Sequence, residues 1–139
     1  MSTSAHVTLF LNLAKASAVL TRTFDNGLGG LGLTEYLILH TLSTAEDEAM
    51  RRTDLASEVG LTASGVTRLL LPMEKIGLVK RVSNENDARV SAVRIAAGGR
   101  RKLAEAQERM ELIADELLDA VPKKEVEVHA NFLRHLAIQ

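Results

Sequence analysis

The segment "DLASEVGLTASGVTRLLLPMEK" (54–75) constrains the fold more than any other, because two short helices must meet there across a turn of about three residues. Thr53 is predicted to cap the first helix and Thr62 the second, since a threonine side chain accepts a hydrogen bond from a first-turn amide. Gly60 suits the end of the first helix, where a left-handed residue is often needed. We therefore expect a helix–turn–helix whose second helix bends or loses its regular form at Pro72.

Gly65 stands in the first turn of this second helix, where glycine costs roughly 1 kcal/mol relative to alanine. The helix packs on the core through an apolar face that contains Val66, Leu69, Leu70 and Met73. A small residue on the exposed side lets a large partner approach closely, and a DNA backbone is one such partner. We expect Gly65 to lie on that exposed side.

Two β-type runs follow, "LVKRVS" (78–83) and "RVSAVRI" (89–95), and the Asn/Asp-containing link between them indicates a β-hairpin. Upstream, the glycine-rich stretch 25–32 is too flexible to continue a helix and is expected to be a flexible joint. A helix capped by Thr34 comes next. The acidic stretch "AEDEA" (45–49) is predicted to be a loop or a fraying helix end.

Amphipathic helices are predicted at both ends of the chain. Residues 4–24 carry apolar side chains mostly at steps of three and four. A long helix restarts in "AAGGRRK" and runs to Val121, and its apolar residues form a seam for packing on another helix. Pro122 breaks it, and a last helix covers about 123–137. The predicted order is therefore helix, helix, helix–turn–helix, hairpin, long helix, helix.

The net charge of −1 conceals an uneven distribution. Residues 51–102 hold 11 Lys/Arg against 5 Asp/Glu, a net +6, whereas the remainder carries −7. A basic middle suggests a polyanionic partner, although a chance excess of solvated charge is an equal alternative. With no cysteine, the chain has neither disulfides nor a thiolate metal site. It shows no signal-peptide pattern and no membrane-spanning run, so a cytoplasmic protein is the simplest interpretation.

A helix–turn–helix followed by a hairpin makes a winged helix–turn–helix, whose second helix enters the major groove of DNA. Thr62 and Ser64 would offer hydroxyls and free first-turn amides to a phosphate. Gly65 would allow close approach. Thr67 and Arg68 lie one turn further along, and the Arg68 guanidinium is placed to donate two hydrogen bonds to a guanine.

In these motifs the sequence resembles the MarR family of bacterial transcription regulators. "DLASEVGLTASGVTRLLLPMEKIGLVKR" and "NENDARVSAVRIAAGGR" follow the family pattern T/S-x-S-x-V-T-R-x-L, then L-E-x-x-G-L-V-x-R, then a wing with D-x-R. The resemblance covers about residues 33–101. The chain departs from it at Pro72, Ala88 and Ala97, where relatives commonly have a polar residue, a second arginine and a threonine cap.

The resemblance implies a mainly α fold with a small β-hairpin wing. Residues 33–99 would form the DNA-binding lobe, and the terminal helices 4–24 and 100–137 would intertwine in a homodimer. In the wing, Asp87 would orient Arg89 at the minor groove. The implied function is a sequence-specific, double-stranded DNA-binding transcription regulator, by family default a repressor of a pseudo-palindromic operator. A small aromatic or anionic effector would relieve the repression, and no other cofactor is expected.

Further candidates come from placement alone. Arg51 and Arg52 stand at the start of the first helix of the helix–turn–helix and are candidates for phosphate contact. His40, on an apolar helix, is either a hydrogen-bonded core residue or part of an effector pocket. The residues proposed to line that pocket are Phe10, Leu13, Tyr36 and His40.

Other readings of the same residues stay open. A winged helix can also bind proteins, with its basic segment facing an acidic partner, and Arg68 or the Asp87–Arg89 pair can be plain surface charge. An enzyme is not expected, because no carboxylate and histidine form a recognisable motif and "GLGGLG" does not follow a strand. A metal site is not expected either, since close helical pairing is absent among the histidines, His6, His40, His129 and His135.

Overall fold

The computed structural model describes residues 2–83 and 91–138. In chain order its elements are α1 (Ala5–Gly27), α2 (Leu33–Thr44), a short 3₁₀ turn η1 (Glu46–Glu48), β1 (Ala49–Arg51), α3 (Arg52–Val59), α4 (Ala63–Lys75), β2 (Val79–Ser83), β3 (Ser91–Ile95), α5 (Ala97–Leu117) and α6 (Lys123–Ala137). The predicted class, mainly α with a small β wing, is confirmed. None of the helices in the described ranges is long and apolar enough to cross a membrane.

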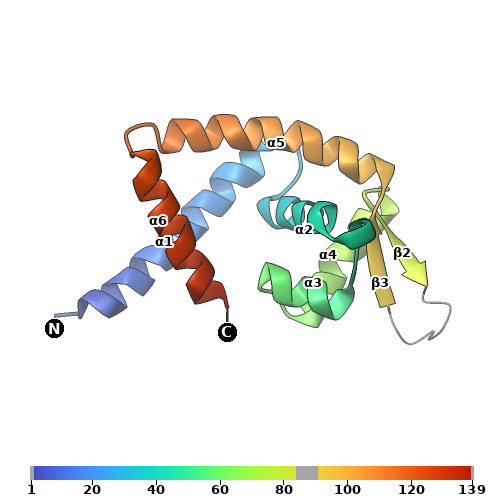
Figure 1. Cartoon of the computed structure of the whole chain (residues 1–139), viewed down its shortest axis with the longest axis horizontal. Helices are drawn as coiled ribbons and strands as arrows, with labels where there is room; N and C mark the ends of the chain where they lie inside the picture. Colours follow the sequence, from blue (N-terminus) through green and yellow to red (C-terminus); the bar gives the residue numbers. More distant parts are fainter. Residues whose placement is uncertain (1, 84–90, 139) are drawn as a thin grey trace.

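The chain divides into a lobe and an arm, which are joined along α5 (Figure 1). The lobe consists of α2, α3, α4, the sheet and the first half of α5. The arm consists of α1, α6 and the second half of α5, and it extends away from the lobe. We use these two names below.

Apolar side chains from all parts of the lobe form its core. Helix α4 contributes Val66, Leu70 and Met73, which are at most 1% exposed, while Leu69 packs at the margin. This is the face that the apolar spacing predicts. The other large side chains under 2% exposed come from the neighbouring elements: Leu28, Leu31, Ile38, Leu39, Leu42, Leu55 and Ile95. Full burial of each stabilises the fold by roughly 1.5–3 kcal/mol relative to exposure, so this core fixes the orientation of α4.

The sheet has three antiparallel strands in the order β1-β3-β2. The predicted hairpin is present as β2 and β3, with Arg81 opposite Val93. Strand β1, which pairs Met50 with Val93, was not predicted. Three residues are too few to show the alternation of a strand, and β1 forms because the free edge of β3 supplies its hydrogen-bond partners.

The start of α2 corrects the predicted cap at Thr34. The N-cap is Gly32, and the helix begins at Leu33. A carboxylate oxygen of Glu35 accepts a hydrogen bond from the Gly32 amide at 2.7 Å, and Asp25 accepts one from the Leu33 amide at 2.7 Å. Two carboxylates therefore satisfy free amides at the start of this helix, where a threonine cap was expected.

The glycine-rich stretch 25–32 continues α1 as far as Gly27 and then forms a packed turn, so the predictions that it cannot continue a helix and that it is a flexible joint are wrong. Leu28 and Leu31 are each 1% exposed and hold the segment in the core. Between them Gly29 and Gly30 adopt φ of 71° and 93°, which other residues rarely do. The Lys102 ammonium on α5 donates to the Gly29 carbonyl at 2.7 Å. The glycines signal an unusual backbone, but burial of the two leucines decides its rigidity.

Helix α5 begins in close contact with the turn before β2. The Ala96 amide donates to the Leu78 carbonyl at 2.9 Å. The backbone of Gly99 lies so near that a Cβ added there would overlap the same carbonyl oxygen and come within 2.9 Å of Ile95 Cγ1. The helix starts at Ala97 although the threonine cap of the family pattern is absent. Backbone packing against Leu78 takes the place of a side-chain cap.

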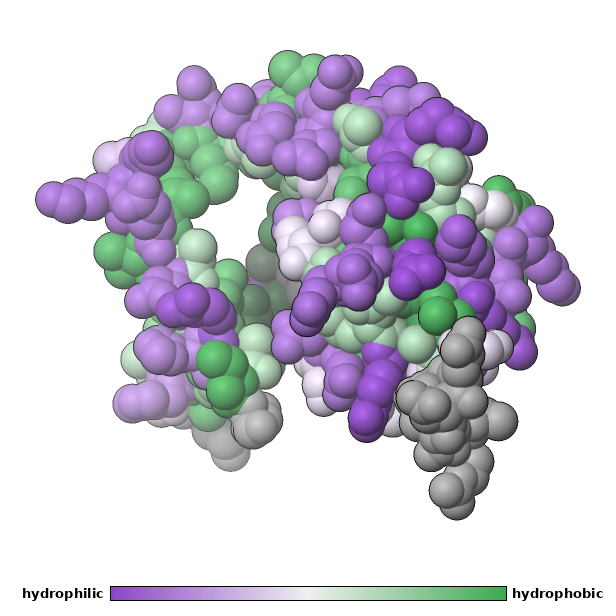
Figure 2. Space-filling model, turned by 45° about the vertical axis from the view of Figure 1, so that its right-hand side comes forward, coloured by the Kyte–Doolittle hydropathy of each residue, from purple (hydrophilic) through white to green (hydrophobic). Residues whose placement is uncertain are grey.

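Apolar side chains on the arm are exposed in this chain. No residue of α1 or α6 in the described ranges is buried. Figure 2 shows green side chains exposed along the arm and an opening between the arm and the lobe. The large apolar residues on the arm that are at least 43% exposed include Val7, Phe10, Leu11, Leu117, Val128, Phe132 and Leu133. Apolar surface of this extent on packed helices indicates contact with another molecule.

Candidate nucleic-acid interface

The first turn of α4 presents hydroxyls and amides to solvent. Thr62 caps the helix as predicted: its Oγ1 accepts a hydrogen bond from the Gly65 amide at 3.0 Å and lies 3.3 Å from Ser64 Oγ. Both hydroxyl-bearing residues are exposed. Other amides of the first turn lack partners inside the helix, so this end of α4 can receive an anion such as a phosphate.

Gly65 has a reason inside the chain to be small. A Cβ added to it would come within 3.1 Å of Thr62 Oγ1, the atom that caps the helix. The residue is half-buried beside that cap. The tight cap is therefore one explanation for a glycine at position 65. The close approach of a DNA backbone is another, and that role of Gly65 stays a prediction.

The cap itself can be tested by replacing Thr62 with alanine. We expect a loss of about 1 kcal/mol in the free energy of unfolding, because the Gly65 amide loses its acceptor. Thr53 is a matched control, since the predicted cap there is wrong: the N-cap lies two residues earlier, at Arg51, and α3 begins at Arg52. Thr53→Ala should change stability by less than about 0.5 kcal/mol in the same urea titration. Equal losses in both variants would contradict the assignment.

The outward face of α4 is cationic. Ser64, Arg68 and Lys75 are exposed, and they lie opposite the buried Val66 and Leu70. Among the described residues neither Arg68 nor Lys75 has an acidic partner. Both charges are therefore available to an anionic partner.

Several other cations of the basic segment are already paired. Arg51 Nε lies 3.7 Å from Asp54, and Arg81 Nε lies 3.4 Å from Glu74. Both arginines are exposed, so each pair contributes little to stability and can open for a phosphate.

Arg52 and Thr67, two predicted DNA contacts, are in contact with each other. Arg52 Nη1 donates to Thr67 Oγ1 at 3.4 Å, which links the start of α3 to α4. Arg52 Nε is buried and has no hydrogen-bond partner in the described part of the chain. Thr67 is half-buried, on the side of α4 that faces α3. The structure thus gives both residues a part in positioning the helix.

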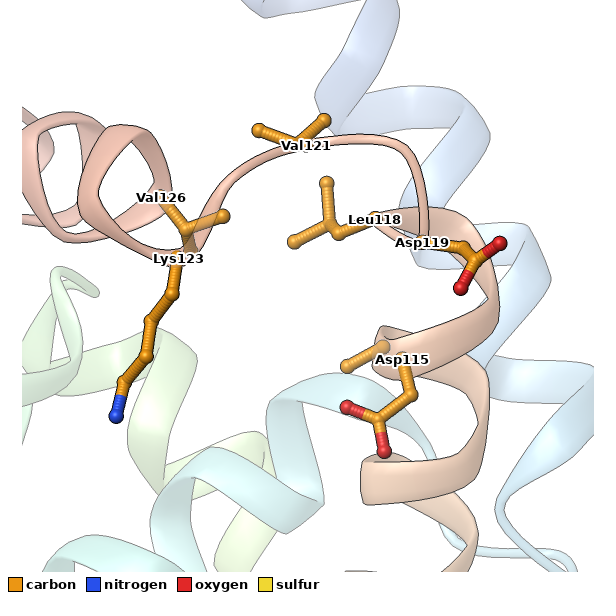
Figure 3. Close-up of a pocket in the computed structure, with 7 residues that line it drawn as sticks. Asp115, Leu118, Asp119, Val121, Lys123 and Val126 are labelled. Atoms are coloured by element: carbon orange, nitrogen blue, oxygen red, sulfur yellow. The ribbon is translucent and has the colours of Figure 1, made fainter.

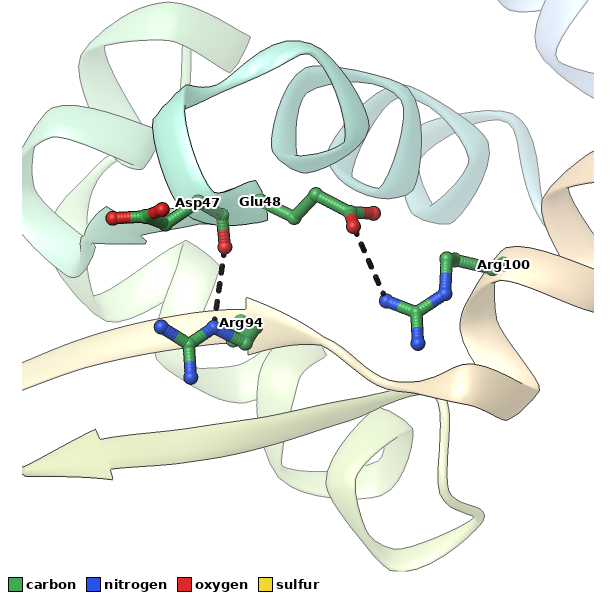
Figure 4. A network of polar contacts seen from close by, with 4 residues as sticks. All are labelled: Asp47, Glu48, Arg94 and Arg100. Atoms are coloured by element: carbon green, nitrogen blue, oxygen red, sulfur yellow. Dashed lines mark hydrogen bonds and ion pairs between the residues drawn. The ribbon is translucent and has the colours of Figure 1, made fainter.

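The wing residues Asp87 and Arg89 lie outside the described residues. At the root of the wing, two arginines contact the turn η1 (Figure 4). Arg94 Nε donates to the Asp47 carbonyl at 3.2 Å, and Arg100 Nη1 lies 3.4 Å from Glu48 Oε1. Asp47 and Glu48 have φ of 58° and 54°, a left-handed conformation unusual for such residues. The partners are 47 and 52 residues apart, so no local pattern reveals them.

The proposed pocket residues separate into two groups. Tyr36 and His40 stack on α2 with ring centroids 6.2 Å apart. Burial, and then the charge of Glu111, raise the pKa of Tyr36. His40 is exposed, so its interpretation as a core residue is wrong in this chain. Phe10 and Leu13 lie on the exposed α1, at 54% and 37% exposure.

A cavity of about 640 Å³ lies where α5 turns into α6 (Figure 3). Leu118, Val121 and Val126 line it together with charged groups from Asp115 and Lys123. The sequence suggested continuous helix to Val121, but α5 ends at Leu117 and the turn that follows opens this space. None of the four proposed pocket residues lines it.

Several known proteins resemble this chain in sequence or in structure. The model of the MarR family matches residues 31–91, which contain the helix–turn–helix. The curated relatives include the HTH-type transcriptional regulator PrsX of Escherichia coli, and the solved structures include MarR-family regulators. These matches support a winged-helix regulator of the MarR family. The chain is also 29% identical to the HTH-type transcriptional repressor YetL of Bacillus subtilis (strain 168) over 97 residues, which is 68% of this chain and 58% of YetL. The chain spans about half the length of the curated relatives it matches.

Two solved structures show the same fold along nearly the whole chain. Sco3205, a MarR-family regulator from Streptomyces coelicolor crystallised with DNA, is 20% identical with a TM-score of 0.83, and the match covers 99% of this chain and 89% of that one. NadR, crystallised with 4-hydroxyphenylacetate, is 23% identical with a TM-score of 0.80, and the match covers 99% and 97%. At these identities the likeness concerns the fold.

Proposed function

We propose that this chain is a MarR-family regulator: a homodimeric, sequence-specific, double-stranded DNA-binding transcription regulator. The observation that carries the proposal is the outward face of α4, where Ser64, Arg68 and Lys75 follow a capped helix start and the two cations lack acidic partners among the described residues. The structure of Sco3205 with DNA supports it, and the repressor YetL supports repression. These relatives indicate a regulator and not an enzyme. A protein that binds promoters is expected in the cytoplasm.

The exposed apolar arm supports the dimer. In a two-fold assembly the same patch of each copy covers the other, so α1, α6 and the end of α5 would be buried together. The predicted division, with a DNA-binding lobe at 33–99 and dimerisation helices at 4–24 and 100–137, is part of this proposal. Core residues Leu28 and Leu103 extend the lobe slightly beyond those bounds. Two copies of α4 would then face half-sites about 10 base pairs apart on a pseudo-palindrome.

The proposal is tested by fluorescence anisotropy with DNA from upstream of the gene and with a scrambled duplex of the same length. We expect a preference of roughly a thousandfold for the upstream DNA, and a steep salt dependence that counts phosphate contacts. Equal, weak binding to both duplexes, together with a failure to enrich any sequence from a random pool, would reject a sequence-specific regulator. A protein-interaction module would then be the better explanation of the winged helix.

The dimer is tested separately by a charge on the arm. Phe132 is 43% exposed in the single chain. Phe132→Asp should shift the protein to monomers in sedimentation velocity, because a buried, unpaired carboxylate costs several kcal/mol. Phe132→Leu keeps the apolar contact and should remain dimeric. A Phe132→Asp variant that sediments as wild type would show that α6 does not form the interface.

A small aromatic or anionic effector completes the proposal. NadR was crystallised with 4-hydroxyphenylacetate, which has both properties. Tyr36 and His40 at the junction of lobe and arm, with Phe10 and Leu13 on the arm, are the proposed contacts. Such coupling is typically about 1–3 kcal/mol, so an effector would weaken DNA binding five- to roughly hundredfold. Titrating aromatic carboxylates into the protein–DNA complex measures this directly.

A further inference from the structure

The outward face of α4 carries a large apolar side chain between its two cations. Leu71 is 42% exposed and stands three residues after Arg68 and four before Lys75. Residues at these spacings share one side of a helix. Pro72 beside it is also exposed. The cationic face is therefore interrupted by an aliphatic patch made of Leu71 and Pro72.

Packing within the chain does not account for Leu71. The core side of α4 is already filled by Val66, Leu70 and Met73, each at most 1% exposed. Pro72 offers no side-chain hydrogen bond, and it stands where the family pattern commonly has a polar residue. The third turn of this helix thus presents hydrocarbon at a place where a hydrogen-bonding side chain would serve a purely phosphate-binding surface better.

The partner of such a patch follows from the charges around it. Arg68 and Lys75 on either side favour a polyanion over an apolar protein surface. Within the major groove the apolar group on a base edge is the C5-methyl of thymine, which aliphatic and other apolar side chains contact. Position and charge together therefore favour thymine.

We propose that Leu71, with Pro72 beside it, recognises a thymine methyl group in the major groove and makes that base pair part of the operator. The inference rests on the proposed function. Three residues of helix rise about 4.5 Å, or between one and two base-pair steps. The thymine therefore lies one or two base pairs from the guanine that faces Arg68, in the direction of Lys75.

The experiment first selects duplexes from a random pool with the wild-type protein. Each enriched thymine is then replaced, one at a time, by deoxyuridine, which removes only the methyl group. We expect one such replacement per half-site to weaken binding about fourfold, the factor that corresponds to one buried methyl group. With Leu71→Ala the same replacement should have no effect. Ile76→Ala is the matched control, because Ile76 is 70% exposed just past the end of α4, and it should keep the wild-type response.

The outcomes separate this inference from the proposed function. If no sequence is enriched, the regulator itself is rejected, and the inference with it. If a sequence is enriched but deoxyuridine has no effect at any position, or the same effect in wild type and Leu71→Ala, the inference alone is overturned. A Leu71→Ala variant that changes the oligomeric state without changing the deoxyuridine response would assign the patch to a protein contact and would also overturn it.

Discussion

Replacing Arg68 with alanine should lower the affinity for the selected operator by at least about 30-fold. A guanidinium that bonds both acceptors of a guanine contributes about 1–3 kcal/mol, and a dimer has two copies. Arg68 is exposed on α4, and among the described residues it has no acidic partner to release. The variant should also lose its preference for guanine at one position in each half-site. Anisotropy against the operator and its base-substituted versions measures both effects.

The control for Arg68 must remove the same charge elsewhere. Lys124 lies in the first turn of α6, on the arm and away from the lobe (Figure 1). Lys124→Ala should change the affinity less than threefold at physiological salt. Salt largely screens the interaction between exposed charges that are more than about 8 Å apart. If both variants weaken operator and random DNA equally, Arg68 acts as a general cation and its role in reading guanine is wrong.

The second large effect is expected on stability. Gly99→Ala should lower the free energy of unfolding by about 3 kcal/mol, because the new methyl group would overlap the Leu78 carbonyl and crowd Ile95. The obstacle is backbone, which cannot rotate away as a side chain does. Denaturant titrations should be made at one protomer concentration, since dimerisation contributes to stability.

Helix propensity alone gives the opposite sign for this substitution. In a helix alanine is favoured over glycine by about 1 kcal/mol, so an open site would be stabilised. Ala104→Ser, at an exposed position of α5, is the control and should change stability by less than about 0.5 kcal/mol. A stabilised Gly99→Ala variant would mean that α5 can move away from the Leu78 turn.

Local chemistry predicted the parts of this fold that depend on neighbouring residues. Thr62 caps α4, Gly60 ends α3 with φ of 71°, and the hairpin pairs as its β-branched residues indicate. Each of these features is decided within a few residues, where hydrogen-bonding capacity and backbone preference act directly. The core face of α4 was predictable for the same reason, since Val66, Leu70 and Met73 follow the helical period.

The remaining features depend on contacts between distant residues. The contact between Arg52 and Thr67 joins two helices, and the contacts of Arg94 and Arg100 with η1 join residues that are 47 and 52 positions apart in the sequence. Thr34 and Thr53 had the right chemistry for caps, but neighbouring carboxylates and the end of β1 decided where the helices start. The DNA-contact residues assigned by resemblance, including Asp87 and Arg89, stay predictions.

The packed turn between α1 and α2 has a mechanical consequence for the proposed dimer. Since Leu28 and Leu31 are buried and Lys102 holds the Gly29 carbonyl, the turn does not absorb strain between arm and lobe. Arm and lobe would then rotate together, as one rigid body, about the two-fold axis of the proposed dimer. In that dimer, a small change of angle at the axis would become a larger displacement of each α4, so an effector bound far from the DNA would alter the distance between the two copies of α4.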